Sequence, residues 1–303
     1  MLRVGVIGVG KMGRHHARIY STLAGASLVG VFDTDVDAAR EVAATYGTRY
    51  FERFESLLDV VDAVSIATPT TTHAEYARAA IDRGIHVLIE KPIADSVRAA
   101  HNIVQLASQR DVVVAVGHVE RYNPVVRKLR ELLEKEEPEL ILLRRVGPYP
   151  PRITDVGIIM DLGIHDIDIA RYLSRSEPRS IKCLKKRACG VHEDVALVSM
   201  EMESGCVVSL TLDWLTPYKV REVDAATATG LFSGNLITQT LKRFSHYEED
   251  NSYLVHEIPV KSAEPLRAEL EEFVNKIISG KGEIITAQEG LINIEIAENC
   301  MSQ

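Results

Sequence analysis

The chain has 303 residues, of which 46% are hydrophobic and 26% are charged, and its formal net charge is −8 at pH 7. This length exceeds what one hydrophobic core usually supports, so we expect two domains. The acidic balance argues against a nucleic-acid partner. Because no apolar run approaches ~18 residues, we also expect no transmembrane span.

Two further features are typical of a cytoplasmic protein. The sequence enters its first expected strand directly after Met1, which leaves no room for a signal peptide. Its cysteines show neither a C-x-x-C spacing nor a cluster of histidines beside them. We therefore expect reduced thiols, no structural disulfides and no metal site.

The first stretch of the chain carries a dinucleotide-binding pattern. The apolar run from Leu2 to Ile7 predicts a buried parallel strand, and the segment from Lys11 to Leu23 predicts a helix. Between them lies G-x-G-x-x-G, whose glycines suit a tight turn, a close approach to a pyrophosphate, and packing of the helix on the strand. The helix N-terminus offers N–H groups to the same pyrophosphate. We expect the cofactor to contact Gly8, Gly10, Lys11, Met12 and Gly13.

A carboxylate follows where this pattern requires one. The run from Leu28 to Phe32 predicts a second strand, which ends at Asp33, 20 positions after Gly13. A carboxylate there binds the ribose hydroxyls of the dinucleotide. With Thr34 and Asp35 after it and no adjacent arginine, Asp33 should repel a 2′-phosphate, so we expect NAD in preference to NADP. The alternative is a strand-turn-helix corner without a ligand.

Strands and helices then alternate as far as residue 118, which predicts an α/β domain with a parallel sheet and right-handed crossovers. Helices are expected at 36–46, 55–58, 72–83 and 96–110, and strands at 49–51, 60–67, 85–89 and 112–116. Two of these strands end at Thr68-Pro69 and at Glu90-Lys91-Pro92, on the edge where such sheets bind ligands. Lys91 could hydrogen-bond a substrate hydroxyl there, and a solvated lysine after a strand is the simpler alternative.

The pattern changes after His118, so we divide the chain into a dinucleotide-binding domain, residues 1–118, and a second domain, residues 119–303. A charged helix at 124–137, a strand at 140–146 and a helix at 157–173 come first. From about residue 180 to 260 the segments read as strands without helices between them, and two helices end the chain. Such runs of strands predict a mainly antiparallel sheet in a domain of α+β type.

The helix at 157–173 carries a group of residues suited to acid–base chemistry. Asp161, His165 and Asp168 stand at i, i+4 and i+7, which places carboxylate, imidazole and carboxylate on one helix face. A histidine beside a carboxylate is a competent general base near neutral pH. A surface charge network and metal ligation by the same residues remain open alternatives.

Basic residues in this acidic chain are candidates for binding an anionic substrate, because the planar guanidinium of arginine suits phosphate. Taken singly, each is more simply a surface charge. The candidates are Arg121 with its neighbours Tyr122 and Asn123, then Arg144, Arg145 and Arg152 around a proline-rich stretch, and Lys219 and Arg221.

Taken in order, these motifs resemble the glucose-fructose oxidoreductase / inositol dehydrogenase family (Gfo/Idh/MocA). The resemblance spans nearly the whole chain and rests on G-x-G-x-x-G, Asp33, Ala67-Thr68-Pro69 with His73, Glu90-Lys91-Pro92 and Asp161-x3-His165-x2-Asp168. It implies an N-terminal Rossmann domain and a C-terminal domain whose open, mostly antiparallel sheet makes a homodimer or homotetramer. It also implies NAD(P)-dependent oxidation or reduction of a carbohydrate or cyclitol carbon.

The resemblance further implies roles for single residues. It assigns Lys91, Asp161 and His165 to catalysis and to substrate contact, with a cis bond between Lys91 and Pro92. It assigns Thr68, Pro69, His73, Glu90 and Lys91 to the cofactor site, and Arg121, Tyr122, Asn123 and Arg152 to the substrate site.

Within the family, segments 117–124, 145–152 and 214–219 resemble members that oxidise the 3-hydroxyl of UDP-N-acetylglucosamine to a ketone. We therefore expect an oxidoreductase that moves a hydride between nicotinamide and a ring carbon of a nucleotide sugar. The alternatives are a dehydrogenase of a free sugar or inositol, a non-catalytic NAD(P)-sensing regulatory protein, and a metal-dependent lyase or epimerase using the Asp161 group.

Overall fold

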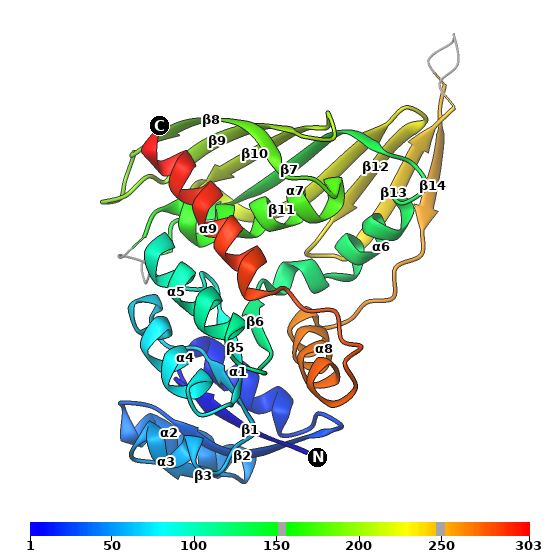
Figure 1. Cartoon of the computed structure of the whole chain (residues 1–303). Coiled ribbons are helices and arrows are strands. Elements are labelled where there is room, and N and C mark those ends of the chain that lie inside the picture. Colours follow the sequence, from blue (N-terminus) through cyan, green and yellow to red (C-terminus); the bar gives the residue numbers. More distant parts are fainter. Residues whose placement is uncertain (151–155, 247–251) are drawn as a thin grey trace. The chain divides into compact units, whose positions relative to one another are not determined.

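A computed structural model describes residues 1–150, 156–246 and 252–303 of the chain, which divides into two units (Figure 1). The first unit comprises Met1–Val119 and Leu266–Ile294, and the second comprises Glu120–Pro265 and Glu295–Gln303. The segment 266–294 belongs to the first unit because Leu270, Phe273 and Val274 are buried in its hydrophobic core.

The first unit is built on a six-stranded sheet in the order β3-β2-β1-β4-β5-β6, with every neighbouring pair parallel. This is the strand order of a Rossmann fold, so the predicted parallel α/β domain is confirmed. Its strands are β1 (Leu2–Ile7), β2 (Ala26–Phe32), β3 (Arg49–Phe51), β4 (Ala63–Ile66), β5 (His86–Glu90) and β6 (Val114–Gly117). Its helices are α1 (Lys11–Tyr20), α2 (Val36–Tyr46), α3 (Phe54–Leu58), α4 (His73–Ile81), α5 (Val97–Ser108) and α8 (Pro265–Ser279), and α9 (Ala287–Ser302) belongs to it as far as Ile294.

Helices cover both faces of this sheet, as two neighbouring residues of β1 show. A side chain at Gly5 would contact Leu57 of α3, whereas Val6 lies beneath Gly13 of α1. Because successive side chains of a strand point to opposite faces, α1 and α3 lie on opposite sides of β1. Burial on both sides explains why β4 is buried at every position and shows no alternation of buried and exposed residues.

The second unit is built on an eight-stranded sheet in the order β14-β13-β12-β11-β7-β10-β9-β8. Strands β7 and β10 pair in parallel and the other neighbours pair antiparallel, so the predicted mostly antiparallel sheet is confirmed. The strands are β7 (Pro138–Pro148), β8 (Pro178–Lys186), β9 (Val195–Met202), β10 (Val207–Asp213), β11 (Leu215–Thr227), β12 (Gly230–Asn235), β13 (Thr240–Ser245) and β14 (Leu254–Ile258). The helices are α6 (Pro124–Leu132) and α7 (Ile164–Ser174), with a π-helical turn, η3 (Ile159–Gly163), before α7.

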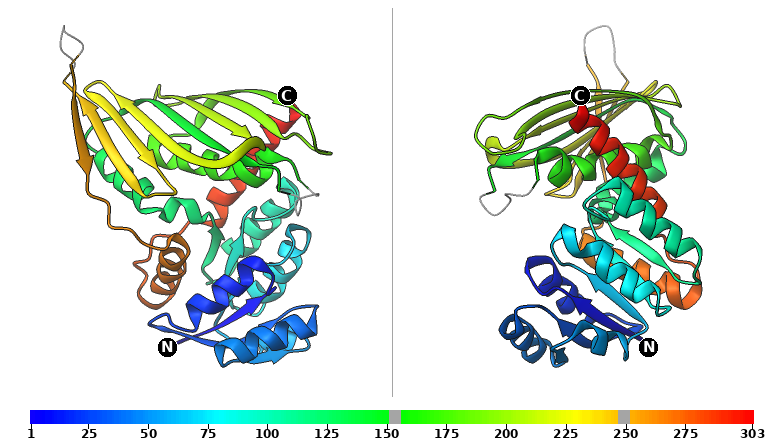
Figure 2. Two further views of the ribbon diagram at one scale, coloured as in Figure 1. Left: turned by 180° about the vertical axis from the view of Figure 1, so that it is seen from behind. Right: turned by 60° about the vertical axis from the view of Figure 1, so that its left-hand side comes forward.

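The two faces of this second sheet differ. Helices α6 and α7 cover one face, where Val198 and Met200 of β9 are buried. Seen from behind in Figure 2, the opposite face carries no helix among the described residues of this unit. Leu184 of β8 and Leu197 of β9 lie directly opposite each other in the strand pairing and are 75% and 47% exposed. The alternation of buried and exposed positions therefore leaves an apolar pair uncovered.

Among the helices within the described ranges, none combines the length and hydrophobicity that crossing a bilayer requires.

Candidate active site

The glycine-rich loop after β1 has the geometry that its sequence predicts. Gly8 has a φ of +85°, which favours glycine, and it lies against the backbone of Ala67. A Cβ at Gly13 would stand 1.8 Å from the carbonyl oxygen of Gly8, so this position admits no side chain. A Cβ at Gly10 would meet no atom within 4 Å. The loop is therefore tight where it packs and open where a pyrophosphate would approach.

The N-terminus of α1 behind this loop is suited to an anion. No described side chain caps it, and its first turn, which contains Lys11 and Met12, has no acidic residue. Uncapped N–H groups and the positive end of the helix dipole attract phosphate. The residues present thus fit the pyrophosphate of a dinucleotide.

Asp33 lies at the end of β2 and is oriented by backbone groups. Its Oδ2 accepts a hydrogen bond from the Val9 N–H at 2.6 Å, and its Oδ1 accepts one from the Asp35 N–H at 2.9 Å. These contacts join the carboxylate directly to the glycine-rich loop. A ribose bound there would meet a carboxylate whose direction is already fixed, which reduces the entropy lost on binding.

The ends of β4 and β5 are joined through His73. The Nδ1 atom of His73 lies 2.9 Å from the Pro92 carbonyl oxygen, and its Nε2 atom lies 3.0 Å from the Thr68 carbonyl oxygen. Burial lowers the pKa of this imidazole in spite of both carbonyls. A neutral imidazole donates from one ring nitrogen, so His73 hydrogen-bonds one of these two carbonyls and lies between the loops that follow β4 and β5, next to Thr68 and Pro69.

Glu90, Lys91 and Pro92 follow β5, and the Lys91–Pro92 bond is cis, as the resemblance implied. Glu90 is almost completely buried, and its Oε1 lies 2.9 Å from Nε2 of His16. Burial acts to raise the pKa of Glu90, but the hydrogen bond from His16 and the nearby charges outweigh it and hold this pKa below its usual value. Lys91 itself is partly exposed.

In the second unit, Asp161 and His165 lie at the start of the helix that was predicted at 157–173. That helix is not uniform, because Asp161 lies in the π-helical turn, where the Ile164 N–H donates to the Ile159 carbonyl five residues back. Both Asp161 and His165 are partly exposed. Glu193 holds the start of this turn, accepting hydrogen bonds from the N–H groups of Ile158 and Ile159 through its carbonyl and carboxylate. Such π-helical turns are frequent at functional sites.

Asp168 does not share the exposure of His165. It is buried, and its carboxylate accepts two hydrogen bonds from the guanidinium of Arg121, one of them at 2.9 Å from Nε. Arg121 also stacks on Tyr172, with its Cζ atom 5.0 Å from the ring centroid. The face that the spacing predicts therefore presents Asp161 and His165, while Asp168 anchors α7.

The other predicted substrate residues have structural contacts. Asn123 caps α6, with its Oδ1 accepting from the Val125 N–H and its Nδ2 donating to the Leu236 carbonyl. Tyr122 is buried. These contacts, like the ion pair of Arg121, favour a structural role. Arg152 lies outside the described residues.

Three residues that sequence reasoning did not single out hold these elements in place. His16 contacts Glu90, Glu193 holds the turn before α7, and Asp166 is paired with Arg145 at 2.6 Å. Burial opposes the charge of Arg145, but Asp166 and Glu120 raise the pKa of its guanidinium above the usual value. Arg145, a candidate for binding an anion, is thus committed to two carboxylates. No spacing in the sequence pairs these distant residues.

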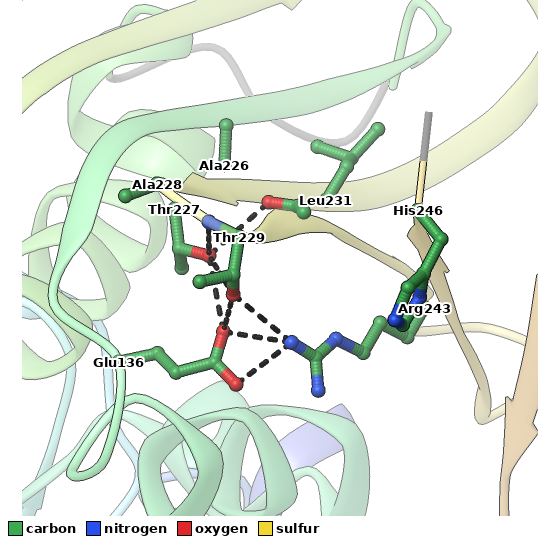
Figure 3. A pocket seen from close by; sticks show the side chains of 9 residues that line it. Glu136, Ala226, Thr227, Ala228, Thr229, Leu231, Arg243 and His246 are labelled. Atoms are coloured by element: carbon green, nitrogen blue, oxygen red, sulfur yellow. Dashed lines mark hydrogen bonds and ion pairs between the residues drawn. The ribbon is translucent and has the colours of Figure 1, made fainter. Parts of the chain in front are cut away.

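A cavity of about 650 Å³ lies in the second unit and is lined by none of the predicted site residues. Figure 3 shows the residues that line it. Its polar groups bind one another: Glu136 accepts hydrogen bonds from Thr227, Thr229 and Arg243. Burial acts to raise the pKa of Glu136, but the hydroxyls and the guanidinium outweigh it and lower this pKa. These contacts tie the β11–β12 turn to the segment before β7, which is a structural role.

Within the described ranges, no group of three or more His, Cys, Asp or Glu side chains is placed to hold a metal ion. All four cysteines, each in a described segment, are free of disulfides.

Known proteins resemble this chain along most of its length. Residues 2–118 match the oxidoreductase family with an NAD-binding Rossmann fold, and residues 144–256 match the Gfo/Idh/MocA C-terminal domain. A UDP-N-acetylglucosamine 3-dehydrogenase of Acidithiobacillus ferrooxidans is 34% identical over 284 residues, covering 91% of this chain and 88% of that protein. A scyllo-inositol 2-dehydrogenase (NAD(+)) of Bacillus subtilis is 28% identical over 315 residues, covering 97% and 92%. A solved structure of the A. ferrooxidans enzyme has a TM-score of 0.93 at 31% identity, covering 98% of this chain and 96% of that one.

A Rossmann sheet with this glycine-rich loop, followed by a mostly antiparallel second sheet and matched by the family model, defines an NAD(P)-binding oxidoreductase. The chain belongs to the Gfo/Idh/MocA family, as its motifs implied. It is an NAD(P)-dependent enzyme of the sugar and inositol dehydrogenase group, whose named relatives act on CH–OH groups.

We predict that Gly10→Ala weakens NAD binding by about tenfold or more while shifting the unfolding midpoint by only a few degrees. The added methyl group meets no protein atom but enters the space left for the pyrophosphate. Gly13→Ala, in contrast, should lower the midpoint sharply because its Cβ collides with Gly8. Calorimetric titration with NAD and a thermal melt measure both effects. Wild-type affinity in Gly10→Ala would contradict this placement of the cofactor.

Proposed function

We propose that this protein is an NAD-dependent dehydrogenase of a nucleotide sugar that oxidises the 3-hydroxyl of UDP-N-acetylglucosamine, or of a close chemical relative, to a ketone. The observation that carries this proposal is the 34% identity to the A. ferrooxidans enzyme over 91% of this chain. An inositol is the second candidate substrate, favoured by the 28% identity to the B. subtilis scyllo-inositol 2-dehydrogenase over 97% of the chain.

Under this proposal, His165 takes the proton of the reacting hydroxyl as the same carbon gives up its hydride. A bound NAD supplies the hydride acceptor. Lys91 donates a hydrogen bond to the oxygen as negative charge develops on it, a stabilisation typically worth ~3 kcal/mol when the donor is preorganised. Asp161 orients the imidazole. The partial exposure of all three side chains supports these roles.

Arg121 and Asp168 then have a supporting role in place of direct substrate contact. Their buried ion pair fixes α7 three residues after His165. Breaking a buried pair by removing one partner costs several kcal/mol, because the remaining charge is left unpaired. The pair would therefore keep the helix that carries the base in one position while the substrate binds.

We predict that His165→Ala lowers kcat by about 10² to 10⁴-fold with UDP-N-acetylglucosamine and NAD, because the general base is lost. NADH formation at 340 nm measures this effect, with N-acetylglucosamine, glucose and inositols as parallel substrates. His192→Ala is the matched control, since His192 is an exposed histidine of the same unit. Turnover of inositols alone would select the second candidate, and full activity of His165→Ala would refute the assignment.

The preference for NAD rests on Asp33. We predict that wild-type kcat/KM favours NAD over NADP by about tenfold or more, and that Asp33→Asn reduces this ratio at least severalfold. Asparagine keeps an oxygen for the Val9 N–H but loses the charge that repels a 2′-phosphate. Asp37→Asn removes one charge from the exposed start of α2 and serves as control. An equal ratio in wild type and Asp33→Asn would show that Asp33 does not select the cofactor.

The helix-free face of the second sheet is the proposed assembly surface between copies of this chain, a homodimer or homotetramer. Its exposed apolar residues include Leu142, Leu184, Leu197 and Val207, which lie on four neighbouring strands. Exposed large apolar side chains on a sheet face that carries no helix support an interface there.

We predict that Leu197→Asp converts the oligomer to a smaller species, because the burial of an unpaired carboxylate opposes association. Light scattering coupled to gel filtration gives the mass of each form. Ile237→Asp places the same charge on an exposed residue of the β12–β13 loop and should leave the mass unchanged. A wild-type monomer, or an unaltered mass for Leu197→Asp, would refute this assembly surface.

A further inference from the structure

The first unit contains a buried histidine behind Lys91 that the proposed chemistry does not use. His16 lies in α1, and its side chain is completely buried. Its Nε2 lies 2.9 Å from Oε1 of Glu90. Its Nδ1 is also buried and has no hydrogen-bond partner within the described part of the chain. An apolar side chain could fill the same space, but it could not make the hydrogen bond to Glu90.

The Glu90 carboxylate is confined on its other side as well. Its Oε2 accepts a hydrogen bond from the Lys91 backbone N–H at 3.3 Å. A Cβ at Gly117 of β6 would stand 3.2 Å from the same oxygen, so the strand beside it leaves little room for the carboxylate to turn. The titratable groups that face Glu90 are His16 of α1, Lys91 beside it and His73 of α4. One oxygen thus touches α1 and the other touches the backbone of Lys91.

We propose that His16 is a positioning residue for Lys91: its hydrogen bond fixes the buried Glu90 carboxylate, which in turn holds the Lys91 N–H and the direction in which the lysine leaves β5. The link to catalysis rests on the proposed function, whereas the positioning of Lys91 does not. A buried carboxylate that loses its donor takes up a proton or turns away. A proton on the carboxylate weakens the hydrogen bond from the Lys91 N–H, and a carboxylate that turns away loses it. A misplacement of about 1 Å at a catalytic group can cost 10²-fold in rate.

The residue after Lys91 is held independently. The ring nitrogens of His73 lie within hydrogen-bond distance of the Pro92 carbonyl and of the Thr68 carbonyl in the loop after β4. His16 touches neither of these groups. Substitution of His16 therefore removes the contact that holds Glu90, next to Lys91, while the contacts of His73 with the loop after β4 remain.

Two amide substitutions at His16 separate this role from simple packing. In His16→Gln the amide nitrogen reaches about as far as Nε2, so the donor to Glu90 is kept. In His16→Asn it reaches only as far as Nδ1, so the donor is lost while polarity is retained. We expect kcat to fall about tenfold or more in His16→Asn with NAD affinity unchanged within about twofold, and His16→Gln to recover most of the loss.

The pH profile gives a readout that packing alone would not move. Without its donor the buried Glu90 has a raised pKa, so it takes up a proton as pH falls within the assay range. The acid limb of kcat should shift upward by about one pH unit in His16→Asn and stay in place in His16→Gln. Tyr20→Phe is the matched control, since it removes a buried hydrogen bond between the same helix and Ser65 of β4. It should lower stability without moving the acid limb.

Amine labelling followed by peptide mass spectrometry tests the same idea without turnover. We expect the labelling rate of Lys91 at neutral pH, relative to the exposed Lys281, to change by about threefold in His16→Asn and to stay near wild type in His16→Gln. This pattern in a wild type that oxidises no sugar or inositol would support the positioning role while refuting the proposed function. Equal labelling and equal pH profiles in His16→Asn, Tyr20→Phe and wild type would overturn the role of His16.

Discussion

The close approach of Gly13 to the carbonyl of Gly8 is the constraint on which the first unit depends. It lets α1 begin immediately after the loop and pack directly on β1, so the N-terminus of the helix faces the carboxyl edge of the sheet. The same approach places His16 within α1 at a depth where it can reach Glu90 on β5. The packing that forms the glycine-rich loop thus also brings a hydrogen-bond donor to Glu90, the last residue of the strand before Lys91.

In the second unit, buried ion pairs hold the helix α7 in place. Asp166 binds Arg145 of β7, and Asp168 binds Arg121 at the start of the unit. These two carboxylates follow His165 by one and three residues, so they leave the helix in different directions and fix both its rotation and its position. A buried pair adds little net stability compared with apolar residues of similar size. Its effect here is to permit one placement of α7, because any other would leave a charge without its partner.

The sequence predicted those features that depend on local structure. The three glycines, Asp33 and the Glu90-Lys91-Pro92 turn are set by neighbouring strands and helices, and the fold around them was predicted correctly. The pairing of Arg121 with Asp168 joins residues far apart in the chain, so nothing in the spacing distinguishes it from a pair of surface charges. The π-helical turn is equally invisible, because it lies at the start of the helix and too few residues precede it for the change of phase to show in the apolar pattern. The return of α8 to the first core depends on Phe273, whose burial no local pattern assigns to one domain or the other.

The two units position their chemical groups by the same physical means. In each, a partly exposed side chain with a proposed catalytic role is adjacent in sequence to a buried carboxylate, Glu90 beside Lys91 and Asp166 beside His165. Each buried carboxylate is held by a basic residue from another element, His16 or Arg145. Because both contacts are made by buried atoms, an exposed neighbouring residue can be substituted without removing either of them.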